Sequence, residues 1–241
     1  MSIEVKNLTK SFKKKEVFRD ISFRVNEGEI LAIAGLSGVG KSTILKLICG
    51  LTQPDSGEII LSDGDVAMVF QYSALFDSLN VYENIAFALK ERKEFRKKYT
   101  EDEIKEIVAQ KLKMVGLEGI EDKMPHELSG GMQKRVSFAR AIVTNPSIIL
   151  YDEPTAGLDP ISSTIIEDYI IRLRNELNTT SIVVTHHLST IKRCADKVIL
   201  LYNEKIVFAG TARDLTENGN DYTRQFITAS IEGPMKVGTT D

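Results

Sequence analysis

The sequence contains little cysteine and no long apolar run, and each of these absences narrows the kind of protein that it can encode. Its two cysteines, Cys49 and Cys194, are far apart and lack the spacing of metal ligands. We therefore predict two buried thiols in a reducing compartment. No apolar stretch approaches the roughly 18 residues that span a bilayer, and no signal peptide precedes the first expected strand. We accordingly expect a soluble, cytoplasmic chain.

Positive charge is not in excess either. The 241 residues include 31 Lys and Arg against 34 Asp and Glu, so the formal net charge is −3 and no electrostatic force favours nucleic acid. Basic residues cluster at Lys13–Lys15 and Arg92–Lys98. We interpret these clusters as solvated faces or loops, the alternative being a contact with a membrane surface or a partner. The length suits one large α/β domain or two small ones.

A glycine-rich run carries the strongest chemical signal. It fits the phosphate-loop pattern G-x-x-x-x-G-K-[ST] and lies between an apolar run, Ile30–Ala34, and a helix-like run, Thr43–Cys49. Glycines let consecutive backbone N–H groups converge on phosphate oxygens, the lysine reaches the β- and γ-phosphates, and the serine hydroxyl can ligate Mg²⁺. A turn that binds nothing is the alternative. The predicted nucleotide-binding residues are Gly35, Leu36, Ser37, Gly38, Val39, Gly40, Lys41, Ser42 and Thr43.

The rest of the chain alternates between strand-like and helix-like patterns. Alternation of apolar and polar residues, as in Ile3–Leu8, predicts short strands before the loop. Between about residues 72 and 128 the pattern is mainly helical, and Thr100 followed by three acidic residues marks a helix start. Apolar strands then return at Ile148–Tyr151 and Ser181–Val184, connected by helices. This order predicts an α/β fold with a helical insertion and an antiparallel N-terminal portion.

Two acidic residues follow the first of these apolar strands. Asp152 stands at the carboxyl end of the strand, where a carboxylate can hold the Mg²⁺ beside a nucleotide. Glu153 comes next and can orient or deprotonate the attacking water. The alternative is an ordinary strand end capped by exposed acids.

A second phosphate-binding device is predicted at Ser129, Gly130 and Gly131, within Leu128–Gln133. Small residues at a helix start expose backbone N–H groups and permit the close approach of an anion. A simple serine N-cap is the alternative.

With these motifs in this order, the chain resembles the ATP-binding subunits of ABC transporters, whose signature motif Leu128–Gln133 matches. The resemblance covers nearly the whole chain. It implies a P-loop NTPase fold of ABC type, with a parallel-sheet core, an antiparallel β N-terminal subdomain and a helical subdomain. It also implies a single ABC ATPase domain over residues 1–230, with 1–71 and 129–230 as the catalytic core and 72–128 as the helical subdomain.

The resemblance assigns roles to four further residues. Phe12 would stack on adenine, and Gln71 would touch Mg²⁺ and report to the membrane subunit. Asp159, in the segment Ala-Gly-Leu-Asp, would lie at the dimer seam, and His186 would contact the γ-phosphate. Plainer alternatives are a half-exposed strand residue, a loop amide and a satisfied strand-end histidine. His187 stands where many relatives have Asp, so the choice between the two histidines stays open.

The resemblance also implies partners. ABC ATPases form head-to-tail dimers around two ATP molecules with Mg²⁺, and they work with an integral membrane permease on the inner face of the cell membrane. A homodimer is expected, and pairing with a different ATPase subunit is the alternative.

The stretch Gln71–Phe87 resembles the Mla-type phospholipid transport ATPases, which act with MCE-domain proteins. The C-terminal part also agrees with that family, with Arg224-Gln225-Phe226 and then Gly233-Pro234. The tail, residues 231–241, is either a disordered end or a segment that holds the partner ATPase. Three alternatives remain: the ATPase of a polar-solute importer, a soluble ABC ATPase without a permease, and a non-hydrolysing module. The last would need Lys41 or Glu153 to be missing, and both are present.

Overall fold

The computed structural model of the chain describes residues 2–13, 15–62 and 64–236. The chain forms two compact units, one of residues 1–63 and 179–241 and the other of residues 64–178. The second unit contains the whole segment 72–128, and the division into a catalytic core and a helical subdomain stays a prediction. Within the described residues, no helix has the length and the apolar character that a bilayer crossing requires.

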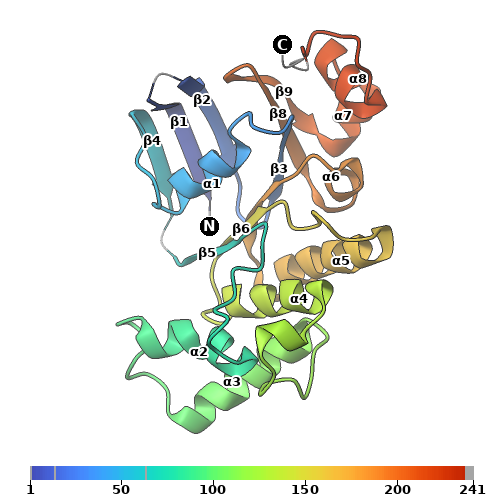
Figure 1. The fold of residues 1–241 in the computed structure, drawn as a ribbon. Coiled ribbons are helices and arrows are strands. Elements are labelled where there is room, and N and C mark those ends of the chain that lie inside the picture. The colour runs from blue at the N-terminus through green and yellow to red at the C-terminus, as the bar shows by residue number, and fades with distance from the viewer. Residues whose placement is uncertain (1, 14, 63, 237–241) are drawn as a thin grey trace. The chain divides into compact units, whose positions relative to one another are not determined.

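The strands of the first unit form two groups (Figure 1). One is an antiparallel sheet with the order β2–β1–β4. The other has the order β7–β3–β8–β9, in which β3 is parallel to both of its neighbours and β9 is antiparallel to β8. The bounds are β1 Ile3–Phe12, β2 Lys15–Val25, β3 Ile30–Gly35, β4 Ser56–Leu61, β7 Thr180–Val184, β8 Lys197–Tyr202 and β9 Lys205–Thr211.

β3 and β7 are buried along their whole lengths. Continuous apolar runs of this kind are typical of central parallel strands, which are covered on both faces. Ile30 lies opposite Ser181 and Ile33 opposite Val184, so the two strands end at the same edge. The strands predicted from these runs are present, each one residue longer than expected.

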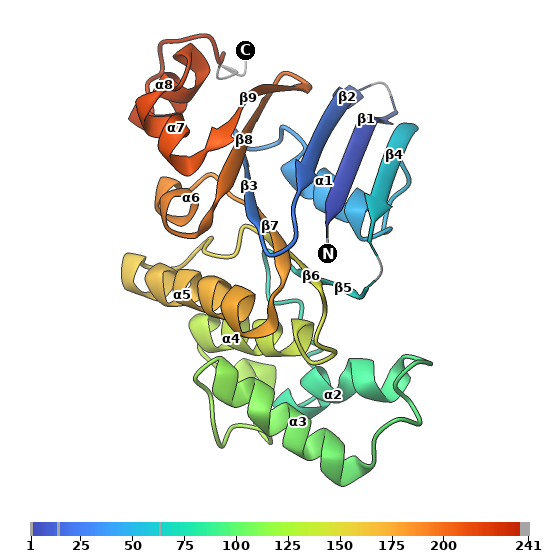
Figure 2. The same cartoon turned by 180° about the vertical axis from the view of Figure 1, so that it is seen from behind.

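Three short helices of the first unit cover one face of β3 and β8 (Figure 2). α6 contributes Ile191 and α7 contributes Leu215 to a buried cluster with Ala32 and Leu200, and Phe226 of α8 packs against it. The helices of this unit are α1 Lys41–Ile48, α6 Leu188–Cys194, α7 Ala212–Glu217 and α8 Asp221–Thr228.

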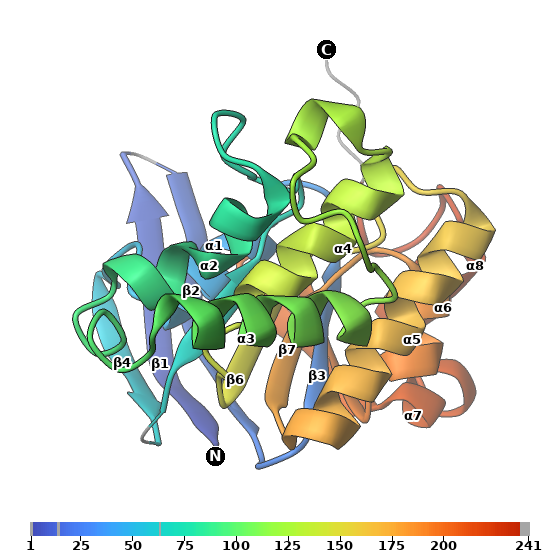
Figure 3. The same ribbon diagram turned by 90° about the horizontal axis from the view of Figure 1, so that it is seen from below.

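The second unit is mainly helical. Its strands β5 and β6 pair in parallel, and α2, α3 and α4 pack against one another (Figure 3). Thr100 caps α3 in a capping box with Glu103, as the acidic first turn predicts. The bounds are β5 Val66–Val69, α2 Val81–Glu91, α3 Glu101–Met114, the 3₁₀ turn η1 Pro125–Glu127, α4 Gly130–Ala141, β6 Ile148–Asp152 and α5 Pro160–Leu177.

The prediction for the cysteines needs correction. Cys194 is buried, but Cys49 is only half-buried because it lies at the C-terminal end of α1, where the chain turns toward solvent. The described part of the tail lies against α8. The Gln225 amide donates to the carbonyl oxygen of Met235 at 2.9 Å and accepts from its N–H at 2.7 Å, and Met235 is 1% exposed. Residues 237–241 of the predicted tail lie outside the described residues.

Asn84 of α2 supports the segment that precedes this helix. Its side chain is fully buried, donates to the carbonyl oxygens of Phe76, Leu79 and Asn80, and accepts from the N–H of Phe76 at 2.8 Å. We predict that Asn84→Ala lowers the free energy of unfolding by about 2–4 kcal/mol, because buried backbone groups lose their partners. Denaturant unfolding followed by circular dichroism measures this, and the exposed Asn175→Ala is the control. Equal stability of the two variants would contradict the prediction.

Candidate nucleotide-binding site

The phosphate loop joins β3 to α1 in the first unit. Lys41, the first residue of α1, is 7% exposed, and its ammonium donates to the carbonyl oxygens of Gly35 at 2.8 Å and Leu36 at 3.1 Å. The side chain therefore folds back over the loop that it follows. This places its charge beside the backbone that would enclose a phosphate.

Two glycines of the loop are required by the backbone. Gly40 has a φ of 102°, and a Cβ there would lie 2.2 Å from Cγ1 of Val17 on β2. Gly35 has a φ of 153°, and a Cβ there would lie 2.7 Å from the carbonyl oxygen of Leu201. A side chain at either position would displace the loop, which explains part of the sequence pattern without reference to a ligand.

Phe12 lies at the end of β1 with 48% of its surface exposed, so its ring is open to a stacking partner. The Lys10 ammonium lies 5.2 Å from the centroid of this ring and 2.7 Å from the Asp55 carboxylate. Lys10 was not among the predicted site residues. The strand period of two, which places residues 10 and 12 on one face, could have identified it.

His186 follows β7 and is exposed. It lines a hollow of about 310 Å³ together with Gly35, Leu36 and Ser37 of the phosphate loop and residues of α8 and the tail. Its ring centroid is 4.2 Å from that of His187, which is absent from this lining. The first unit thus brings the predicted histidine next to the loop.

In the second unit, the predicted acids stand at the end of β6. Asp152 is 6% exposed and Glu153 is 7% exposed, so the alternative of exposed acids at a strand end is wrong. Glu153 also has a φ of 44°, in the left-handed region that non-glycine residues seldom occupy. Strain of this kind persists where the surrounding structure fixes a residue, and it is concentrated at functional sites.

The predicted signature motif begins α4. Ser129 is the N-cap of this helix, because its hydroxyl accepts from the N–H of Met132 at 3.3 Å. The N-cap that was given as the alternative is therefore present, and it does not exclude an anion site. Added Cβ atoms at Gly130 and Gly131 would meet nothing within 4 Å. Because glycine weakens a helix and the chain itself leaves this space open, the fold gives no steric reason for the two glycines. Close approach of a ligand supplies one.

Asp159 lines a hollow of about 420 Å³ together with Ser129, Gly130 and Gly131. It is also the N-cap of α5, because its carboxylate accepts from the N–H groups of Ile161 and Ser162, each at 3.0 Å. The hydrogen bond from the Ser162 hydroxyl, with that from its N–H, lowers the pKa of Asp159. A place for Asp159 at the dimer seam stays a prediction, and its capping role was not predicted.

Gln71 lies on an exposed bend after β5. Its carbonyl oxygen accepts from the ammonium of Lys134 on α4, and Arg140 of the same helix donates to the carbonyl oxygens of Ser73 and Ala74. The loop that starts at Gln71 is therefore bound to the helix that starts at the signature motif. Lys134 was not predicted, because nothing in its local sequence distinguishes it from an exposed lysine.

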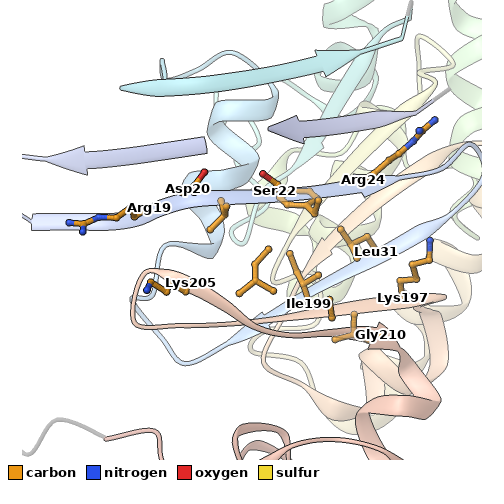
Figure 4. A pocket seen from close by; sticks show the side chains of 14 residues that line it. Arg19, Asp20, Ser22, Arg24, Leu31, Lys197, Ile199, Lys205 and Gly210 are labelled. Carbon is orange, nitrogen blue, oxygen red and sulfur yellow. The ribbon is translucent and has the colours of Figure 1, made fainter. Parts of the chain in front are cut away.

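A different hollow of the first unit lies between β2 and the β8–β9 hairpin and has a volume of about 660 Å³ (Figure 4). Arg24 and Lys197 lie toward one end of it, and Arg19 and Lys205 toward the other. Of the described residues that line it, none is a predicted site residue. We assign it no part in the nucleotide site.

Comparison with known proteins identifies the family. A family model described as ABC transporter matches residues 18–156, more than half of the chain. The chain belongs to the ABC transporter family. It is 42% identical to Protein TRIGALACTOSYLDIACYLGLYCEROL 3, chloroplastic, of Arabidopsis thaliana, over 97% of its own length and 75% of that protein. It is 37% identical to the Intermembrane phospholipid transport system ATP-binding protein MlaF of Haemophilus influenzae, over 97% and 93% of the two chains.

This ABC ATPase is also similar to two further proteins. It is 36% identical to the Probable ribonucleotide transport ATP-binding protein mkl of Mycobacterium leprae, over 98% of its own length and 71% of that protein. A solved dimeric ATP-binding cassette in a post-hydrolysis state, bound to ADP and Pi, matches with a TM-score of 0.78 and 30% identity. That match covers 88% of this chain and 99% of the other. The predicted family, the predicted α/β fold of ABC type and the predicted ATPase class are confirmed.

The glycine at position 40 offers a test of the loop. We predict that Gly40→Ala weakens ATP binding at least about tenfold, because the Cβ clashes with Val17 and strains the backbone. Titration with a fluorescent ATP analogue measures the affinity. Gly50→Ala is the matched control, since Gly50 also has a positive φ, 75°, but a Cβ there meets nothing within 4 Å. Native affinity in the Gly40 variant would refute the packing argument.

Proposed function

We propose that this ABC ATPase binds and hydrolyses ATP to drive phospholipid transport through a separate membrane permease. The observation that carries the catalytic part is the pair of buried carboxylates after β6, Asp152 and Glu153, in a chain that also has a complete phosphate loop. The lipid part is supported by the relative named for intermembrane phospholipid transport, 93% of whose length this chain covers.

In this proposal the first unit holds the nucleotide. Backbone N–H groups of the loop and the Lys41 ammonium bind the β- and γ-phosphates, and Phe12 stacks on adenine. His186 contacts the γ-phosphate, which its position in one hollow with Leu36 and Ser37 supports. Since Lys41 donates to two loop carbonyls, ATP would draw it from these partners onto phosphate oxygens.

The oxygen donors of the chain suit Mg²⁺. The Ser42 hydroxyl, the Asp152 carboxylate and the Gln71 side-chain amide are hard ligands of the type that this ion prefers. Asp152 ends the buried strand β6, and a carboxylate at the carboxyl end of a strand can hold the Mg²⁺ beside a nucleotide. These three residues would hold the ion, which when bound neutralises negative charge on the phosphates.

Glu153 acts on the attacking water. Its carboxylate accepts a proton from the water as the water oxygen bonds to the γ-phosphorus, and the bond from that phosphorus to the β–γ bridging oxygen breaks. The products are ADP and phosphate. The left-handed backbone of Glu153 fixes where the side chain leaves the main chain, which favours one orientation for the base.

A second copy of the chain completes the site. Ser129, Gly130 and Gly131 of the partner copy present the N-terminus of α4 to the γ-phosphate and exclude water from it. The open space above the two glycines supports this role. ATP would therefore hold the two copies together in a head-to-tail homodimer, and its hydrolysis would release them.

The permease docks on the second unit at the inner face of the membrane. Phe76 and Phe87 are 45% and 42% exposed, lie with ring centroids 4.9 Å apart, and line a hollow of about 360 Å³. An exposed aromatic pair beside a hollow suits the apolar face of a helix from a membrane subunit. An MCE-domain protein would complete the transport system.

The role of Glu153 has a direct test. We predict that Glu153→Gln binds ATP as the native chain does, hydrolyses it at least about a hundredfold more slowly, and accumulates as a dimer, because the amide cannot take a proton from water. Phosphate release and light scattering after size exclusion, with ATP and Mg²⁺, measure both effects. Glu106→Gln, on the exposed side of α3, is the control. Near-normal turnover of the Glu153 variant would remove this residue from the base role.

The transported substrate is tested through the partners. We predict that tagged Glu153→Gln protein, purified from its own cells in mild detergent with ATP and Mg²⁺, brings down a multi-span permease, an MCE-type protein and phospholipid. Mass spectrometry identifies the proteins and lipids. A permease with a solute-binding protein would instead indicate a polar-solute importer. Soluble partners alone would contradict a role in transport.

A further inference from the structure

A buried lysine of the second unit is hydrogen-bonded to one predicted site residue and lies near two others. Lys134 is the fifth residue of α4, the helix that begins at the signature motif, and it is 6% exposed. Its ammonium donates to the main-chain carbonyl oxygen of Gln71, 63 residues earlier in the chain. Removing an ammonium from water is unfavourable unless it gains good partners, so lysine is rarely buried without a specific contact.

The charges around Lys134 include the predicted metal ligand Asp152 and the predicted base Glu153. Burial lowers the pKa of Lys134, whereas the carboxylates of Asp152 and Glu153 act in the opposite direction. The ammonium thus lies in the electrostatic field of both acids while it is bonded to Gln71. One side chain of α4 is therefore hydrogen-bonded to the start of the loop and lies in the electrostatic field of the acids at the end of β6.

A second cation of α4 holds the same loop. Arg140 donates to the carbonyl oxygens of Ala74 at 2.7 Å and Ser73 at 3.2 Å, and its guanidinium carbon lies 5.9 Å from the centroid of the Phe76 ring. Charged donors give stronger hydrogen bonds to carbonyl groups than neutral ones do. The loop is consequently fixed to α4 from its first residue to its fourth.

We propose that Lys134 is a positioning residue: by holding the main chain of Gln71, it aims the Gln71 side chain at the reacting end of ATP. The inference rests on the proposed function, in which that side chain touches Mg²⁺. A main-chain hydrogen bond determines where a side chain starts, and a displacement of about 1 Å at a reacting centre is enough to slow a reaction strongly.

Steady-state ATP hydrolysis by the purified full chain tests this role. Lys134→Met should lower kcat by about ten- to a hundredfold while the KM for ATP changes less than about twofold, because the lost alignment matters at the transition state and not for ATP binding. Lys134→Arg, which keeps a cationic donor, should restore most of the rate. The control is Lys111→Met: Lys111 is 7% exposed in the same unit, but its ammonium donates to Asn145. This variant should keep the native kcat.

A double-mutant comparison separates positioning from general destabilisation. If Lys134 acts through the Gln71 side chain, Lys134→Met should slow the Gln71→Ala variant no further. The inference is overturned if Lys134→Met hydrolyses ATP at the native rate, or if Lys111→Met lowers kcat as much as Lys134→Met does. It is also overturned if the double variant shows the product of the two single reductions in kcat. Lys134→Gln serves the same comparisons if the methionine variant does not fold. Failure of the native chain itself to hydrolyse ATP would reject the proposed function instead.

Discussion

The candidate site depends on where buried strands end. β3, β6 and β7 are buried throughout, and the predicted polar residues of the site follow their carboxyl ends. β3 runs into the phosphate loop, and His186 follows β7. Because β3 and β7 are parallel neighbours, the segments that follow them leave at one edge of the sheet. That is why Ser37 and His186, far apart in the sequence, line the same hollow.

Local sequence patterns predicted these strands well, because burial on both faces leaves a continuous apolar run and each run ends at a conspicuous polar motif. They said nothing of contacts that join distant segments. The bond from Lys134 to Gln71 spans 63 residues, and the Gln225 amide that orders the tail binds Met235 through the main chain. Neither contact has a signature in one sequence. Cys49 was misjudged for a related reason, since apolar neighbours do not show which way a helix end faces.

Two of the predicted site residues also cap helices. Ser129 and Asp159 use their side-chain oxygens to cap α4 and α5, and these caps fix the direction in which each helix begins. A helix N-terminus has more N–H groups than a single cap can satisfy. The Ser129 hydroxyl takes the N–H of Met132, so the N–H groups of the two preceding glycines can face an anion. In the proposed function, capping and phosphate binding would therefore reinforce each other.

In the proposed function, the loop from Gln71 to Asn80 would couple hydrolysis to transport. Lys134 and Arg140 of α4 hold its first half, and the buried Asn84 of α2 holds its second half. Coupling between distant sites can be carried by packed side chains and hydrogen-bond networks, and a loop held from both sides provides such contacts. The Phe76 ring of this loop is exposed, whereas the main chain of the loop is hydrogen-bonded to α4 and α2. A displacement of the signature helix would therefore reach a docked permease through polar contacts and not through a flexible linker.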